Sequence, residues 1–370
     1  MTDQTGTNDL RMSAVGDISM GDHPVCAGHG MRSAFQSKKD DILRNMKPYL
    51  EAGDIAFGNL ETVASNAGLK PHWLPSFEMR GDPASLKYLK NAGIDLLGVA
   101  NNHSMQHGAA AFQDCIDHLH SGGFGVMGVD PKPGRTEPYV FRKDGVAHTF
   151  FAVSMRPEEW HDGPVPYSLR AYPGKKSHSE LLAEVMALKK DCEGFLVCSI
   201  HWGLEVLDYP GPDEISLGRA LIDAGVDVVV GHHSHLLWPI ERYGNGLIFY
   251  SLGNFVFDLW ARDTKLSVIA DIRLREGQVP DYSLIPVVIS EDFTLLRADT
   301  VESKDILSRL AETSLPEELT AEQYRQNHLA AVKIAKPRKY RYFMRNFYRY
   351  SPNFFFQSLF RTLLRRLAGD

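Results

Sequence analysis

Cysteine is scarce in this chain, and long apolar runs are missing. The four cysteines, Cys26, Cys115, Cys192 and Cys198, are scattered and form no C-x-x-C pair. This spacing favours free thiols in a reducing compartment over a disulfide framework. A helix that crosses a bilayer needs about 20 consecutive apolar residues. The sequence has no such run, and we therefore expect no membrane-spanning helix.

The chain also lacks a secretory signal and an excess of positive charge. Its first nine residues are polar, without the basic and apolar regions of a signal peptide. The formal net charge of -6 gives no indication of nucleic-acid binding. These absences predict a cytoplasmic protein that does not bind nucleic acid.

The content of apolar residues is ordinary for a globular protein, at 44% hydrophobic and 23% charged. From about residue 11 to 290, strand-like apolar runs alternate with amphipathic segments, which predicts an α/β fold. We expect helices over residues 40–51, 83–91, 109–120, 179–190 and 213–224. The 370 residues are enough for one large α/β domain with an appendage.

Short polar clusters follow several apolar runs, at the point where each predicted strand ends. The runs are 12–15, 55–57, 94–100, 195–200 and 226–230, and the clusters contain Asp17, Glu61, Asn102, His103, His201, His232, His233 and His235. In an open α/β sheet, ligands bind at the carboxyl ends of the strands, so we expect the clusters to converge. Carboxylates, an amide oxygen and imidazoles together suit one divalent metal ion or two.

The predicted metal ligands are Asp17, Glu61, Asn102, His201, His233 and His235. The strongest local signal is the H-x-H of His233 and His235 after a glycine. On extended backbone these two residues would share a face, so they could chelate one ion or divide between two. The neighbouring His232 could be the ligand instead, and we otherwise place it in substrate binding.

His103 is the candidate catalytic residue. Neighbouring side chains point in different directions, so Asn102 can bind metal while His103 faces the substrate. A histidine suits the role of general acid or transition-state stabiliser. Arg80 could hold a carboxylate or phosphate. Glu205 belongs to the polar cluster that begins at His201, and Asn254 follows another apolar run. Both complete the predicted set of substrate-binding residues.

The composition changes after about residue 330. From Lys333 onward, ten lysines and arginines stand against one acid, Asp370, and aromatic residues are interleaved with them. Such a segment could lie on anionic lipid or bind a partner. It could instead pack its aromatic side chains on the body of the protein. We expect a main domain over residues 1–300 and a helical, basic and aromatic extension over residues 301–370.

The clusters, in this order, resemble the bacterial CapA family of capsule and poly-gamma-glutamate synthesis proteins, which is related to the calcineurin-like metallophosphoesterases. The matching stretches are V-G-D-I at 15–18, G-N-L-E at 58–61, A-N-N-H at 100–103, H-W-G at 201–203 with Glu205, G-H-H-S-H at 231–235 and Y-S-L-G-N-F-V-F-D at 250–258. The resemblance implies a metallophosphatase-like α/β/β/α sandwich with two central mixed sheets. It also implies a metal centre at one edge, for which we expect one or two ions of Mn, Fe or Zn.

Two features differ from the phosphoesterase pattern. The expected Asp-x-His opening is Asp17-Ile18-Ser19 here, and Glu61 is the nearest substitute for the bridging aspartate. The resemblance implies a metal-dependent hydrolase of surface-polymer biosynthesis that acts on a polymer, peptide or phosphorylated substrate, with His103 as the acid.

Two alternative functions remain open. One is a metal-dependent peptide Cα epimerase. The other is a non-catalytic factor for polymer assembly or export. In each case the C-terminal extension could hold the protein at the inner face of the membrane or against a membrane synthase.

Overall fold

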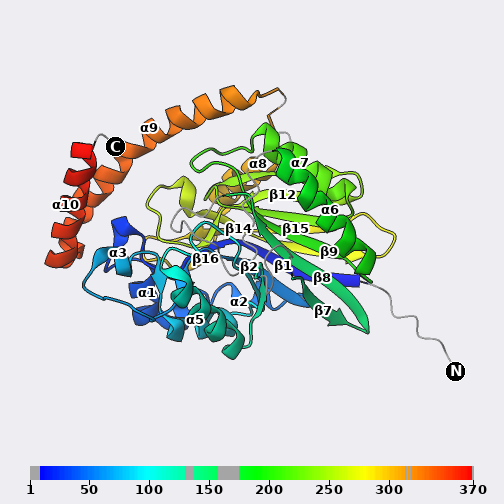
Figure 1. Ribbon diagram of the computed structural model, residues 1–370, viewed down its shortest axis with the longest axis horizontal. Helices are drawn as coiled ribbons and strands as arrows, with labels where there is room; N and C mark the ends of the chain where they lie inside the picture. The colour runs from blue at the N-terminus through cyan, green and yellow to red at the C-terminus, as the bar shows by residue number, and fades with distance from the viewer. Residues whose placement is uncertain (1–8, 130–136, 157–174, 313–314, 317, 369–370) are drawn as a thin grey trace.

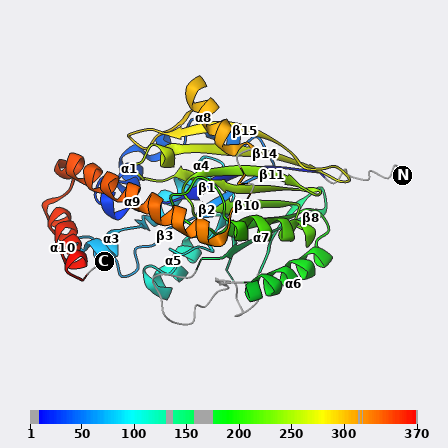
Figure 2. The ribbon, with the colours of Figure 1, turned by 90° about the horizontal axis from the view of Figure 1, so that it is seen from above.

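Two β-sheets lie face to face at the centre of the protein, and helices cover the outer face of each (Figures 1 and 2). The computed structural model describes residues 9–129, 137–156, 175–312, 315–316 and 318–368. The predicted α/β/β/α sandwich with two central sheets is thereby confirmed.

The first sheet is mixed, with the order β16-β15-β14-β1-β2-β5-β6, and β13 pairs with the end of β1. Its strands are β1 (Asp9–Ile18), β2 (Ile55–Leu60), β5 (Leu96–Gly98), β6 (Gly125–Met127), β13 (Asn254–Val256), β14 (Leu266–Arg275), β15 (Asp281–Ile289) and β16 (Leu295–Arg297). Strands β1, β2, β5 and β6 are parallel, whereas β14, β15 and β16 are joined by antiparallel pairing.

The second sheet is also mixed and has the order β11-β12-β10-β9-β8-β7. Its strands are β7 (Tyr139–Lys143), β8 (Val146–Ser154), β9 (Leu196–His201), β10 (Val228–His232), β11 (Leu237–Tyr243) and β12 (Gly246–Leu252). The four central strands β8, β9, β10 and β12 are parallel, and antiparallel strands close both edges. A small separate sheet pairs β3 (Val63–Ala64) with β4 (Arg80–Gly81).

Alternation along the strands separates the apolar side chains into distinct core layers. In β9, Val197 packs between the two sheets, whereas Leu196 and Cys198 pack against the helices outside the second sheet. In β1, Met12 packs between the sheets and Val15 packs on the opposite side. Strands buried on both faces contain near-continuous apolar runs, which is why short apolar runs in the sequence identified them.

Helices α1 (Met31–Lys38), α2 (Lys47–Leu50), α4 (Leu86–Asn91) and α5 (Gly108–Ser121) cover the first sheet, and α6 (Lys175–Asp191) and α7 (Pro212–Asp223) cover the second. The prediction of one helix over 40–51 is wrong. That segment contains the 3-10 helix η2 (Lys39–Ile42), turns and the short α2. Pro48 has no N–H to donate to the carbonyl of Arg44, so a continuous helix is disfavoured.

The α-helices α8, α9 and α10 follow the last strand in the described part of the chain. Helix α8 (Thr300–Leu310) packs Ile306 and Leu310 into the layer between the sheets. Helices α9 (Ala321–Asn346) and α10 (Pro352–Ala368) then extend to one end of the molecule, in orange and red in Figure 1. The division at residue 300 stays a prediction. Among the described residues, no helix combines the length and hydrophobicity needed to cross a membrane.

Contacts with two loops hold the C-terminal helices against the body. The ring of Tyr350 packs edge-on against His29 at 4.6 Å between centroids. Phe354 packs on the ring of Phe77, at 5.0 Å between centroids. Near α3 (Leu74–Phe77), Arg361 of α10 forms an ion pair with the buried Glu78 at 2.6 Å.

Candidate metal centre

The carboxyl ends of parallel strands from both sheets bring the predicted ligands together. Asp17 lies opposite Asn59 in the register of β1 and β2, and His201 lies opposite His232 in the register of β9 and β10. All four side chains are buried. Parallel strands that share an orientation have their carboxyl ends at one edge, so residues far apart in sequence meet there.

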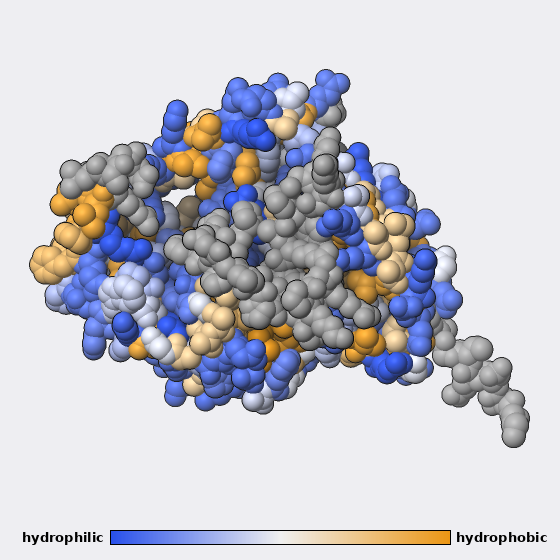
Figure 3. Space-filling model, in the orientation of Figure 1, coloured by the Kyte–Doolittle hydropathy of each residue, from blue (hydrophilic) through white to orange (hydrophobic). Residues whose placement is uncertain are grey.

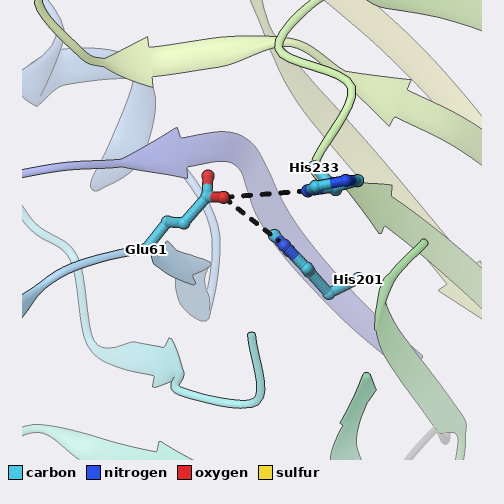
Figure 4. Close-up of side chains that lie close together, drawn as sticks. All are labelled: Glu61, His201 and His233. Atoms are coloured by element: carbon cyan, nitrogen blue, oxygen red, sulfur yellow. Dashed lines mark ion pairs between the residues drawn. The ribbon is translucent and has the colours of Figure 1, made fainter. Parts of the chain in front are cut away.

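The first ligand group contains Glu61, His201 and His233 (Figure 4). Glu61 Oε1 lies 3.4 Å from His201 Nε2 and 3.9 Å from His233 Nδ1. The predicted ligand Asn102 joins this group, because its Oδ1 lies 2.8 Å from His201 Nε2. Four predicted ligands therefore face a common point.

The second ligand group contains Asp17, Glu61 and His235. His235 Nδ1 lies 3.6 Å from Asp17 Oδ2 and 3.7 Å from Glu61 Oε2. His232 lies beside this group, with its Nδ1 3.4 Å from Asp17 Oδ1. Glu61 belongs to both groups and presents a different carboxylate oxygen to each.

The donors fit divalent metal ions in chemistry and in spacing. Bonds of about 2.1 Å to a tetrahedral ion separate neighbouring ligand atoms by about 3.4 Å. In each group the ligand atoms lie within 4.8 Å of one another. His232 Nε2 and His233 Nδ1 are buried, and neither makes a hydrogen bond within the described part of the chain. Carboxylates combined with imidazoles suit Mn, Fe or Zn.

Electrostatics keep these side chains in the protonation states that metal ligands require. Burial lowers the pKa of His201 well below its ordinary value, and the neighbouring histidines lower it further. Burial also lowers the pKa of His233, with a smaller effect from Arg156. Burial raises the pKa of Asp17, but its contacts with His232 and other polar neighbours outweigh burial, and the net pKa is lowered. Neutral imidazoles and an ionised carboxylate are the forms that bind metal.

Two asparagines that we did not predict as site residues support the ligands. Asn59 Nδ2 donates to Asp17 Oδ1 at 2.8 Å and lies 3.3 Å from His201 Nδ1. Asn101 Nδ2 donates to Asn59 Oδ1 at 3.2 Å and to the carbonyl of Leu60 at 2.9 Å. Both asparagines belong to the polar clusters seen in the sequence. No local pattern distinguishes an amide that orients a ligand from one that binds metal.

The turn that holds His233 and His235 differs from the extended backbone expected of this H-x-H. His233 has φ 91° and His235 has φ 60°, both in the left-handed region. The N–H of His233 donates to Asp17 Oδ2 at 3.1 Å, which ties the turn to β1. Non-glycine residues in this region cost about 1–3 kcal/mol each and are enriched at functional sites. The two rings lie 6.2 Å apart and contribute to different ligand groups.

Asn254 lies beside the second ligand group. Its Oδ1 lies 2.9 Å from His235 Nδ1, and its Nδ2 donates to the carbonyl of Thr264 at 3.0 Å. This geometry places the amide oxygen of Asn254 next to the nitrogen of His235 that faces Asp17 and Glu61. The predicted role of Asn254 in substrate binding stays a prediction.

A cavity of about 1230 Å³ opens in front of the centre, and its rim includes His23, His103, Glu205 and His235. His103 Nδ1 lies 2.8 Å from Gln106 Oε1. We did not predict His23, because it follows no apolar run. The N–H of Val25 donates to His23 Nδ1 at 3.1 Å, which leaves the ring proton on Nε2.

Arg80 is not among the residues that line this cavity. Its guanidinium is buried and donates to the backbone carbonyls of Ser65, at 2.8 Å, and of Ala67. These donors are used within the fold. The substrate-binding role of Arg80 stays a prediction, and this geometry gives it no support.

The four-layer sandwich with carboxylate and imidazole donors at its strand ends defines an α/β/β/α protein with a candidate divalent metal centre. Residues 11–259 match the family described as bacterial capsule synthesis protein PGA_cap, and the chain belongs to this family. The capsule biosynthesis protein CapA of Bacillus anthracis is 30% identical over 298 residues, which cover 76% of this chain and 68% of that protein. The PGA biosynthesis protein CapA of Bacillus subtilis is 27% identical over 314 residues, which cover 82% and 78% of the two chains. The predicted CapA membership is thereby confirmed.

A solved structure shows a weaker likeness. The sulfate thiohydrolase SoxB of Thermus thermophilus, in complex with glycerol, aligns with a TM-score of 0.42 at 12% sequence identity. The alignment covers 86% of this chain and 60% of that protein, so the chain spans less than two thirds of its length. A likeness at this level does not bear on activity.

Proposed function

We propose that this protein is a metal-dependent enzyme of capsule or poly-gamma-glutamate biosynthesis, and that it hydrolyses its substrate at a centre of two divalent ions. The observation that supports this most strongly is the pair of ligand groups that share Glu61, beside an open cavity. The names of the Bacillus relatives support the biosynthetic setting. We propose a polymer, peptide or phosphorylated molecule as the substrate.

A divalent ion bound here would lower the pKa of a water molecule and polarise a substrate oxygen. The chain's own residues supply orientation and proton transfer. Gln106 Oε1 accepts from His103 Nδ1, so the second ring nitrogen of His103 is the atom that takes or gives a proton at the leaving group. Asn59 holds Asp17 in place by donating to its Oδ1.

The metal content of purified variants tests the shared ligand. Wild-type protein should hold two ions per chain. His233→Ala and His235→Ala should each lose one ion, because each removes a ligand from one group, and Glu61→Ala should lose both. Mass spectrometry of the metals gives the counts. His120→Ala, on the exposed side of α5, is the matched control and should keep both ions. Wild-type protein without metal after reconstitution would contradict the proposal.

The metal-loaded protein should then release product from phosphoester or poly-gamma-glutamate substrates, and His103→Ala should reduce kcat. The same assay in deuterated water tests the alternative that the protein is a peptide Cα epimerase. Deuterium uptake at a substrate Cα without cleavage would contradict hydrolysis and favour epimerisation. Polymer synthesis in cells that survives His103→Ala would favour an assembly factor.

We also propose that the protein associates peripherally with the inner face of the membrane through its C-terminal helices. Their large exposed apolar side chains include Phe347, Tyr348, Phe356, Phe360 and Leu364. Apolar side chains beside basic residues suit the surface of an anionic bilayer.

A further inference from the structure

The cavity in front of the candidate metal centre has two walls of different character. One wall is the rim of the centre, with His23, His103 and His235. The other is built by the C-terminal helices: α9 contributes Val332, Ile334, Phe343 and Met344, and α10 contributes Leu359 and Leu363. The volume of about 1230 Å³ exceeds the roughly 300–1,000 Å³ of common small-molecule sites. The cavity therefore has room for a ligand larger than a single polar metabolite.

The wall formed by the helices includes exposed apolar side chains. Ile334 lines the cavity although 61% of its surface is exposed. On α10, Leu359 and Leu363 line the cavity, whereas Phe356 and Phe360 form a separate exposed stripe. Figure 3 shows hydrophobic side chains over these helices at the left, bordering a hollow beside the body. Apolar surface that lines a concave space is typical of a site that binds an apolar group.

The same cavity has an excess of positive charge. Helix α9 contributes Lys336, Arg338 and Lys339 to its lining. Three acids also line it. Glu78 is paired with Arg361 at 2.6 Å, and Asp263 is paired with Arg309 at 2.9 Å. Among the described residues that line the cavity, Glu205 is the remaining acid beside Lys336, Arg338 and Lys339.

Lys339 and His23 line the same cavity. The pKa of His23 is lowered well below its ordinary value, first by burial and then by the charge of Lys339. The lining thus combines cationic and imidazole side chains with the aliphatic side chains of α9 and α10.

We propose that this cavity binds an anionic amphiphile, with its alkyl or prenyl chain between α9 and α10 and its phosphate head group beside Lys336, Lys339 and the rim of the centre. A free phosphate would leave the apolar wall uncovered, and a neutral lipid would not use the cations. Binding of this kind does not depend on catalysis at the centre.

Calorimetric titration of the full chain with octyl, decyl and dodecyl phosphate tests the proposal at concentrations below micelle formation. We expect one molecule per chain, with affinity that rises about fourfold for each added methylene. Inorganic phosphate and dodecyl maltoside should each bind at least about tenfold more weakly than dodecyl phosphate. Affinity independent of chain length, or equal binding of either control compound, would overturn the proposal.

Matched variants on α9 distinguish binding in the cavity from binding elsewhere on the protein surface. Ile334→Asn, in the lining, is compared with Leu329→Asn, which lies outside it with a similar exposure of 60%. A Lys336→Gln, Lys339→Gln double variant is compared with Lys333→Gln, Arg341→Gln, which removes equal charge outside the lining.

The lining variants should lose about tenfold in affinity for dodecyl phosphate, and the outside variants less than about twofold. Equal losses in both sets would overturn the proposal. Circular dichroism confirms that each variant is folded. Binding should survive treatment with a chelator, so a failure of the two-metal proposal would leave this result unchanged.

Discussion

The folded protein should lose stability between pH 6 and pH 8 because of a carboxyl group buried beside the cavity. Asp258 is buried, and burial together with the neighbouring Asp22 raises its pKa to about 8. Its Oδ2 accepts N–H bonds from His23 at 2.9 Å and Met31 at 3.2 Å. Its Oδ1 has no hydrogen-bond partner in the described part of the chain. Asp258 therefore holds a proton at neutral pH.

The size of the effect follows from the difference in pKa between the folded and unfolded chain. The unfolded carboxyl ionises near pKa 3.8, so from about pH 4 to 8 the folded state binds one proton more. Each pH unit in this range lowers the free energy of unfolding by about 1.4 kcal/mol. The stabilisation is complete below pH 3.8 and is lost as the pH rises through 8. From pH 6 to pH 8 the loss is about 2.3 kcal/mol.

Asp258→Asn removes this titration and keeps an oxygen acceptor for the N–H groups of His23 and Met31. Urea unfolding at pH 6, 7 and 8 measures the difference between the variant and the wild type. The wild type should lose about 2.3 kcal/mol relative to the variant over this range. A difference in the free energy of unfolding that is the same at every pH does not affect this comparison, because the test uses only the change with pH. Exposed Asp144→Asn should follow the wild type, and parallel profiles of the wild type and Asp258→Asn would refute the reasoning.

Two further predictions concern the strand edge and the membrane surface. Gly16→Ala should destabilise the protein by about 1–3 kcal/mol in urea unfolding, because the added Cβ would lie 1.9 Å from the carbonyl oxygen of Gly253; wild-type stability would contradict this close approach. A Phe356→Ser, Phe360→Ser double variant should sediment less with anionic phospholipid vesicles than wild-type protein, whereas Val301→Ser on α8 should not. Equal sedimentation of all three would remove the proposal of membrane contact.

Local sequence pattern was sufficient to predict the convergence of the site. An apolar run followed by a polar cluster marks a buried strand and its carboxyl end. Parallel pairing of such strands then brings their ends to one edge. Asp17, His201 and His233 follow this rule, and each lies in one of the two ligand groups. The rule uses only the period and polarity of short segments, which the sequence contains directly.

Local pattern was insufficient where the geometry of a turn mattered. The H-x-H of His233 and His235 indicates a chelating pair on extended backbone, but both residues adopt positive φ and divide between two groups. The hydrogen bond from the N–H of His233 to Asp17 spans 216 residues along the chain. A contact of this kind fixes a backbone conformation that neighbouring residues do not encode.

The sequence by itself determined the α/β class, the strand ends that supply the candidate ligands and the basic, aromatic character of the C-terminal segment. Only the tertiary structure decided that Asn59 donates to the candidate ligand Asp17, that Arg80 donates to backbone carbonyls within the fold, and that α9 and α10 form a wall of the cavity. The reason is physical. Periodicity and polarity are properties of short segments, whereas a ligand's orientation and a cavity's walls depend on packing between segments hundreds of residues apart.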